Sequence, residues 1–435
     1  MTARVRDAVD TTVWREVGAP LVPATATGPL TGHTVAVKDL FAVAGYPLGA
    51  GVAAYLAERA PESRHATIVA ALLAAGADLT GIATTDEFAY SITGGNGRTG
   101  MPVNPAAPQR VPGGSSSGPA VAVARGEASI GLGTDTAGSI RVPGAYQGLW
   151  GIRTTHGSLD TTGLLPLAPS FDTIGWLARD AATLAAVTEA MHAMAGPGRA
   201  SPGDSSAATA DGRRAAPGPA APGHEPDQRS EGAAPQADRA EPTQLVVDPA
   251  LCAAAQPGTA EQCLGAASEL GATPVALRAE LDRWFGAFRT VQAHEAWAGH
   301  GAWITAHPEA LEPEVADRFA WAATVTDDGA GAARKVLAEA AIRIREVVGD
   351  RALLLPTTAG PPPYRDADVR TRDAARTATL RLTCLAAIAG LPAVTLPLPR
   401  HDGLPIGLCL LGAAHTDHAL IGLAARCASA LTGSA

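Results

Sequence analysis

The 435-residue sequence is poor in charge and in aromatic side chains: Asp, Glu, Lys and Arg make up 17% of it, and Phe, Trp and Tyr make up 4%. Its formal net charge of -9 leaves no excess of basic residues. This argues against a general nucleic-acid-binding surface, although not against a local basic patch. Hydrophobic residues still account for 46% of the chain, enough for one large core or two ordinary domains.

Long apolar runs and paired cysteines are also missing. No stretch of about 18 uninterrupted apolar residues predicts a transmembrane helix, and the first twenty residues contain no apolar segment of signal-peptide length. The cysteines are odd in number, lie in the second half and never form a CxxC pair. We therefore expect reduced, buried thiols in a cytoplasmic protein, with no disulfide framework and no metal site. They are Cys252, Cys263, Cys384, Cys409 and Cys427.

The composition changes abruptly within the chain. Residues 196–243 contain almost no Leu, Ile, Val, Phe or Trp and many Pro, Gly, Ala and Ser. Such a segment cannot bury enough apolar surface to offset the entropy lost on ordering. We predict a single domain over residues 1–435, interrupted by a disordered insertion at 196–243.

Outside that segment, strand and helix patterns alternate. Residues 33–41 predict a strand running into a loop, and residues 66–75 predict a helix that Gly76 ends. A second helix start follows near residue 85, and another near Gly138. Amphipathic helices are predicted over 281–304 and 331–349, and buried strands over 244–248, 351–360 and 391–399. Alternation of this kind predicts an α/β fold.

The most informative stretch is "GGSSSGPA", residues 113–120, with three consecutive serines between glycines. A purely structural loop is one interpretation. The sequence also matches G-x-S-x-G with Ser116 at the centre, but that nucleophile motif requires a preceding strand. The residues before it, "NPAAPQRVP", contain three prolines and make a poor central strand.

A second Gly-rich stretch, "GLGTDTAGSIRVPG", covers residues 131–144. It invites comparison with a phosphate-binding loop, since Gly133 and Gly138 are five residues apart. That loop needs a lysine directly after the second glycine, where this chain has Ser139. A nucleotide-binding function is therefore disfavoured.

Taken together with Lys38 in "VAVKDLF", the two stretches resemble the amidase signature family of serine amidohydrolases. Ser115 and Ser139 are 24 residues apart (139 minus 115), the spacing between the bridging and nucleophilic serines in that family. Further similar pieces are "TDEFAYS", "SFDTIGWLARD" and the C-terminal "GLPAVTLPL" and "GLPIGLCLLG". The resemblance covers most of the chain outside 196–243. It implies a large twisted mixed β-sheet with helices on both sides.

The resemblance also implies a set of catalytic roles. Lys38 would be the base, Ser115 the proton relay after a cis peptide bond, and Ser139 the nucleophile. The backbone N–H groups of Thr136, Ala137 and Gly138 would hold the oxyanion. Apart from the resemblance, we expect Ser116, Asp135 and Arg141 to shape the loop; the alternatives are direct catalytic support by Ser116 and substrate contact by Asp135 and Arg141. No metal or organic cofactor is required.

The chemistry explains why such residues are needed. A serine hydroxyl is a weak nucleophile without a base, and a lysine can act as that base only when burial keeps it neutral. Three departures from the family pattern stand out: Ala137 and Ser117 replace glycines, and Cys409 replaces a glutamine. Because alanine cannot adopt glycine-only backbone angles cheaply, the geometry of the loop at Ala137 is in question.

The resemblance implies cleavage of a small carboxylic-acid amide to the acid and ammonia through the Ser-Ser-Lys relay and an acyl-enzyme. The order of motifs is most similar to the indole-3-acetamide hydrolase-like branch, which makes an aryl- or indole-acetamide the candidate substrate. Candidate pocket residues are Phe88, Tyr90, Ser91, Gly94, Gly95 and Asn96, with Phe171 and Asp172 as weaker ones; Phe88 and Tyr90 could equally be core. The alternative function is the ammonia-producing subunit of a tRNA-dependent amidotransferase. A non-catalytic binding protein is a third. A homodimer is expected only from the family, with no direct nucleic-acid or membrane partner.

Overall fold

The computed structural model describes residues 9–97, 99–195 and 240–433. Most of the predicted insertion, residues 196–239, lies outside them. Within the described residues one eleven-stranded sheet runs through the molecule, in the order β1-β3-β2-β4-β6-β5-β10-β11-β9-β7-β8. The strands are β1 Trp14–Val22, β2 Thr34–Lys38, β3 Asp78–Ala83, β4 Ile130–Thr134, β5 Trp150–Arg153, β6 Ile174–Ala178, β7 Leu245–Val247, β8 Thr273–Pro274, β9 Ala352–Pro356, β10 Ala393–His401 and β11 Leu404–Leu411.

The sheet is mixed. Strand β2 runs parallel to both of its neighbours, β3 and β4, and β7 runs parallel to β8 and β9. The remaining pairs are antiparallel, including β5 with β10, which joins the part of the chain before residue 196 to the part after 239. A mixed sheet confirms the fold class predicted from the sequence.

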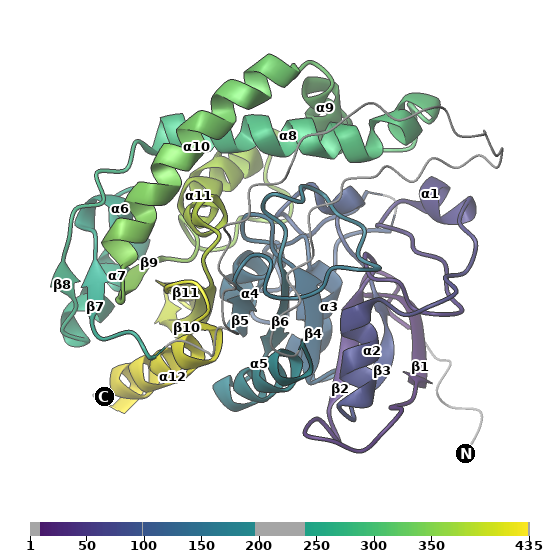
Figure 1. Cartoon of the computed structure of the whole chain (residues 1–435), viewed down its shortest axis with the longest axis horizontal. Coiled ribbons are helices and arrows are strands. Elements are labelled where there is room, and N and C mark those ends of the chain that lie inside the picture. Colours follow the sequence, from purple (N-terminus) through teal and green to yellow (C-terminus); the bar gives the residue numbers. More distant parts are fainter. Residues whose placement is uncertain (1–8, 98, 196–239, 434–435) are drawn as a thin grey trace, which may run out of the picture.

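Helices cover both faces of the sheet (Figure 1). They are α1 Ala53–Ala57, α2 Thr67–Ala74, α3 Ser117–Ala124, α4 Arg141–Gln147, α5 Ala181–Ala195, α6 Pro249–Cys252, α7 Pro257–Glu269, α8 Leu281–Ala306, α9 Pro313–Ala322, α10 Asp327–Val348, α11 Val369–Ala389 and α12 Asp417–Gly433. No helix in the described residues is both long and apolar enough to cross a membrane.

Alternate residues along the strands enter different cores, as a sheet buried on both faces requires. On β9, Leu354 joins the cluster beneath α2, α5 and α12, whereas Leu353 and Leu355 join the cluster with α8, α10 and α11. On β2, Val35 and Val37 lie in the first of these clusters, and Ala36 packs with α3. The strands are therefore near-continuous apolar runs.

The predicted elements match the observed ones closely, with one exception. Residues 66–75 form α2, residues 281–304 and 331–349 form α8 and most of α10, and 391–399 form most of β10. The helix start predicted near residue 85 is only a single 3₁₀ turn, Glu87–Ala89, because Phe88 and Ala89 take positive φ angles of 46° and 57°. The five cysteines are buried free thiols.

The topology places the candidate catalytic residues at the carboxyl ends of two central strands. Strands β2 and β4 are adjacent and parallel, and they end at Lys38 and Thr134. The carboxyl ends of parallel neighbours lie side by side, so the loops that follow them meet there. The serine loop and the segment around Ser139 pack against these strand ends.

Candidate active site

Lys38 is fully buried at the end of β2. Its Nζ lies 2.8 Å from Ser115 Oγ and 2.8 Å from Thr134 Oγ1. Burial lowers the pKa of Lys38 to about 7, against the opposing influence of Asp86, Asp172 and Asp135. A large share of this lysine is therefore neutral near pH 7, and a neutral amine can accept the proton of the Ser115 hydroxyl.

The serine loop bends so that Ser115 faces Lys38. The Gly114–Ser115 peptide bond is cis, which confirms this implication of the family resemblance. Ser116 ties the loop to the second stretch, since its N–H donates to Ser139 O over 3.2 Å and its hydroxyl donates to Thr134 O over 3.3 Å. Helix α3 begins at Ser117. These bonds fit the loop-ordering role expected for Ser116.

Asp135 anchors the backbone on the other side of Ser139. Its buried carboxylate accepts hydrogen bonds from Gly138 N at 2.7 Å and from Arg141 Nε and Nη2 at 3.0 and 2.9 Å. Burial alone would raise the pKa of Asp135, but the guanidinium groups of Arg141 and Arg153 hold that pKa well below its usual range. The ion-paired network therefore keeps its charges across the physiological pH range.

The backbone N–H groups predicted to hold the oxyanion are not equivalent. Gly138 N–H already donates to Asp135, which is a correction to its predicted availability. Within the described residues, no protein acceptor is found for the N–H groups of Thr136 and Ala137. The strained backbone position is Gly138, with φ 130°, and Ala137 keeps a negative φ. Alanine at 137 therefore fits without the strain that the sequence suggested.

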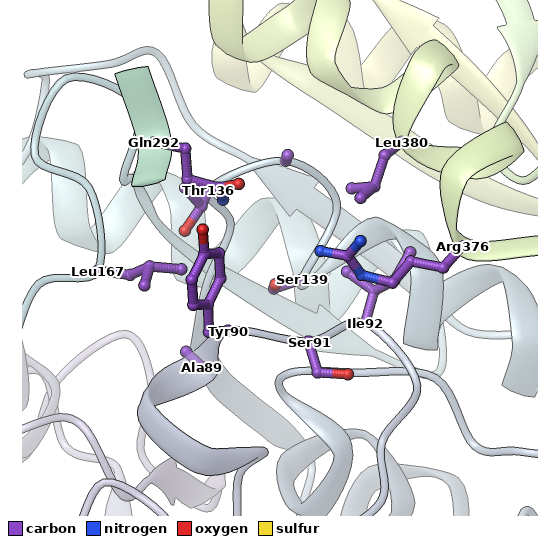
Figure 2. A pocket seen from close by; sticks show the side chains of 11 residues that line it. Ala89, Tyr90, Ser91, Ile92, Thr136, Ser139, Leu167, Gln292, Arg376 and Leu380 are labelled. Atoms are coloured by element: carbon purple, nitrogen blue, oxygen red, sulfur yellow. The ribbon is translucent and has the colours of Figure 1, made fainter. Parts of the chain in front are cut away.

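Ser139 lines a recess at the protein surface (Figure 2). Its wall combines apolar side chains with a few polar groups. From here on, the recess means the cavity lined by Ala89, Tyr90, Ser91, Ile92, Thr136, Ala137, Ser139, Leu167, Gln292, Arg376 and Leu380.

Two of the predicted pocket residues, Tyr90 and Ser91, line the recess. Phe88 does not: its ring packs on His300 at a centroid distance of 4.5 Å and on Tyr55 at 5.3 Å, inside the aromatic core. Gly94 donates its N–H to Asp86 Oδ2 at 3.0 Å and lies against Gly113.

The other candidates also lie outside the wall. Gly95 lies against Met101, where an added Cβ would come within 2.8 Å of its methyl group. Asn96 donates to Gly51 O at 2.6 Å. Phe171 packs on Phe288, while Asp172 supports the wall indirectly by accepting the Thr136 hydroxyl at 2.6 Å.

Sequence reasoning missed several residues that contribute to the site. Thr134 contacts Lys38, Arg153 contacts Asp135, and Thr383 of α11 donates its hydroxyl to Ala137 O. Arg376 and Gln292 reach the recess from α11 and α8. Thr134 and Arg153 lie in or close to the stretch around Ser139 and could have been found there, whereas Gln292, Arg376 and Thr383 come from helices distant in sequence.

Comparison with known proteins gives the chain its relatives. The sequence profile of the family described as Amidase matches residues 16–216. Amidase 1 from Arabidopsis thaliana is 30% identical, over 93% of this chain and 94% of that protein. A solved structure described as the crystal structure of amidase superposes with a TM-score of 0.74 at 26% identity, covering 92% of this chain and 84% of that one.

One subunit of the glutamyl-tRNA(Gln) amidotransferase of Halobacterium salinarum is 42% identical, but the match covers only 40% of this chain and 40% of that protein. The match to Amidase 1, in contrast, spans nearly the whole of both proteins. The chain belongs to the amidase family and is an amide-cleaving hydrolase.

Proposed function

We propose that this amidase hydrolyses a small carboxylic-acid amide to the acid and ammonia through a relay of Lys38, Ser115 and Ser139. The observation that carries the proposal is the 2.8 Å contact between Lys38 Nζ and Ser115 Oγ, within a site that excludes water from the lysine. The neutral amine and the hydroxyl are thereby within proton-transfer distance. Ser139 opens onto the recess, where an amide can reach it.

The relay first carries a proton away from Ser139 and later returns a proton to the leaving group. Lys38 takes the proton of Ser115, Ser115 takes that of Ser139, and Ser139 Oγ forms a bond to the amide carbonyl carbon. The N–H groups of Thr136 and Ala137, without acceptors in the described protein, are available to the resulting oxyanion. The relay then returns the proton to the departing nitrogen as the C–N bond breaks. Water cleaves the acyl-enzyme by the same route.

The acyl group proposed from the sequence is aryl- or indole-acetic, as in the indole-3-acetamide hydrolase-like branch. The apolar part of the recess supports an apolar acyl moiety, because Tyr90, Leu167 and Leu380 face it. A flat ring could pack between such side chains.

The test is ammonia release from indole-3-acetamide, phenylacetamide, benzamide, propionamide, malonamate and glutamine, with wild type and Ser139→Ala measured together. We expect turnover of at least one small amide and its loss in the variant. Ser116→Ala is the matched control, since it removes a hydroxyl one residue from the relay and should leave measurable activity. Turnover that survives Ser139→Ala would contradict the assignment of Ser139 as the nucleophile.

The second candidate is the ammonia-producing subunit of a tRNA-dependent amidotransferase. It is favoured by the 42% identity to the amidotransferase subunit of Halobacterium salinarum, over 40% of this chain. Activity of the isolated chain on small amides would argue for the amidase, and strict dependence on partner chains for the alternative.

We also propose a cytoplasmic location and a homodimer. Size-exclusion chromatography with light scattering tests the homodimer.

A further inference from the structure

Arg376 is a charged side chain in the recess that the proposed relay does not use. It comes from α11 and lines the recess together with Ser139. Figure 2 shows its guanidinium group turned into the cavity, toward Ser139 and between Leu380 and Ile92. The side chain is only 10% exposed, so this charge is removed from bulk water.

The protein supplies this guanidinium group with neither a full set of hydrogen-bond partners nor a close counterion. Its Nε is buried without a hydrogen-bond partner. The acid nearest to it is Asp373, at 3.9 Å from Nη1, and the side chain of Asp373 is 61% exposed. A contact this long to a solvated carboxylate is a weak counterion. A buried arginine is ordinarily paired, because leaving it unpaired costs free energy.

The surroundings add positive charge. Burial lowers the pKa of Arg376 to about 9, and the nearby charges of Arg318 and Arg289 contribute to that shift. Glu314, the acid beside Arg318, is shared with Arg372 at 2.6 Å. On the far side of the recess the carboxylate of Asp172 is occupied by Thr136, Leu167 and Ala168. The Arg376 side of the recess is therefore cationic, with no acid of its own pointing inward among the lining residues.

A guanidinium presents its N–H donors in a planar fork that matches the two oxygens of a carboxylate. Gln292 also lines the recess, across from Arg376 in Figure 2, and offers an amide that can add a further hydrogen bond to a bound substrate. Leu380 supplies apolar surface beside Arg376, and Tyr90 supplies it on the other side of Ser139 (Figure 2).

We infer that Arg376 binds a carboxylate on the acyl group, so that the preferred substrate is the monoamide of a dicarboxylic acid. The inference rests on the proposed function, because it places the amide at Ser139 and the carboxylate at the opposite end of the same acyl chain. An aryl acyl group is compatible with it when the ring also carries a carboxylate.

The test compares amides of equal length that differ only at the far end. Succinamate and butyramide form one pair, and 4-carboxyphenylacetamide and 4-methylphenylacetamide the other. In the wild type we expect kcat/KM for the anionic member to exceed that of the neutral member by about tenfold or more in at least one pair. In Arg376→Met that ratio should fall to about one or below. Because the ratio is taken within one enzyme preparation, a general loss of folded protein cancels from it.

Three further variants sharpen the result. Arg376→Lys keeps the charge and should retain part of the preference. Arg376→Glu should reverse it, favouring 4-aminobutyramide over succinamate. Arg370→Met is the matched control, since Arg370 is an exposed arginine on the same helix, and it should leave the ratio unchanged.

Failure of the inference and failure of the proposed function give different results. Equal or better turnover of the neutral amides by the wild type, or a ratio that Arg376→Met leaves unchanged, would overturn the carboxylate site while leaving the amidase intact. If no amide is hydrolysed, calorimetric binding of succinamate and butyramide to Ser139→Ala, with and without Arg376→Met, decides the inference separately. Tighter binding of succinamate that depends on Arg376 supports it, and equal binding overturns it.

Discussion

Lys38 is the residue on which the proposed chemistry depends, and its environment acts on it in two opposing ways. Full burial removes water from the ammonium and lowers the pKa to about 7, whereas Asp86, Asp172 and Asp135 attract the charged form. Burial dominates, because none of these carboxylates makes a direct ion pair with Nζ among the described residues. The contacts to Ser115 and Thr134 then orient the amine without fixing its charge.

This balance predicts the pH dependence of the enzyme. If the neutral amine is the base, as proposed, kcat/KM should rise with pH through about 7 and level off above it. At pH 5 the neutral fraction, and with it kcat/KM, should be lower than the plateau by roughly 100-fold. Steady-state kinetics on one hydrolysed amide between pH 5 and 9 measure this. A profile that stays flat from pH 5 would contradict Lys38 as a base with a depressed pKa.

Lys38→Met is the control for this prediction. Proton linkage fixes the direction in which the free energy of unfolding changes with pH. The pKa of Lys38 is about 7 in the folded protein against 10.5 in an exposed chain, so between those values the unfolded state holds more protons. The wild type should therefore gain unfolding free energy as pH rises through this window. The variant should be inactive and should lack that part of the gain, as measured by urea unfolding at pH 7 and 9.

At the scale of elements, the loop between β4 and α4 is held by charges that come from several segments. Asp135 lies just after β4, Arg141 at the first residue of α4 and Arg153 at the last residue of β5. Helix α11 joins them, since Arg141 Nη2 donates to Thr383 O at 3.0 Å. The position of Ser139 therefore depends on four elements, and a rigid support of this kind is what an activated nucleophile requires.

Asp135→Asn should collapse this support. Two buried guanidinium groups would lose their counterion, and removal of one partner from a buried pair costs about 3–5 kcal/mol. We expect the free energy of unfolding in urea to fall by about that amount, together with loss of activity. The pKa of Asp135 lies well below its usual range, so its contribution is present above pH 4 and the difference should be constant from pH 5 to 7.

Asp366→Asn is the comparison for that measurement, because Asp366 is exposed. It should change the unfolding free energy by less than about 0.5 kcal/mol. If Asp135→Asn were equally mild, the ion-pair network would not be what stabilises the loop.

At the scale of the whole molecule, one sheet joins the two parts of the chain on either side of residues 196–239. Strand β5 pairs with β10 through Arg153 and Ala393, and α5 packs against α12. Lys38, Ser115 and Ser139 of the proposed relay come from the first part, whereas Arg376 and Gln292 come from the second. The recess therefore exists only when both parts are assembled.

This arrangement predicts the outcome of limited proteolysis. If residues 196–243 are the disordered insertion that their composition indicates, trypsin should cut first at Arg199, Arg213, Arg214, Arg229 or Arg239. The two fragments should remain associated through the sheet and should keep full amidase activity. Mass spectrometry locates the cut, and size-exclusion chromatography shows the association. Early cleavage elsewhere, or loss of activity on nicking within this segment, would contradict the prediction.

The sequence by itself determined the features that are encoded locally. Apolar periodicity predicts α2, α8 and α10, and the long spaced motifs single out Lys38, Ser115 and Ser139 before any contact is known. Both can be read from neighbouring residues. A helix or strand shows a fixed period of apolar side chains, and a family motif is recognised from a contiguous run of residues.

The tertiary structure decided which side chains meet across long separations. Phe88 belongs to the aromatic core and not to the recess, because positive φ angles turn the chain after Asp86. Arg376 enters the recess from a helix more than 200 residues further along the chain than Ser139, and nothing in the local sequence distinguishes it from the exposed Arg370 on the same helix. Burial, and with it the depressed pKa of Lys38 and the unsatisfied charge of Arg376, arises only when the sheet and its helices pack together.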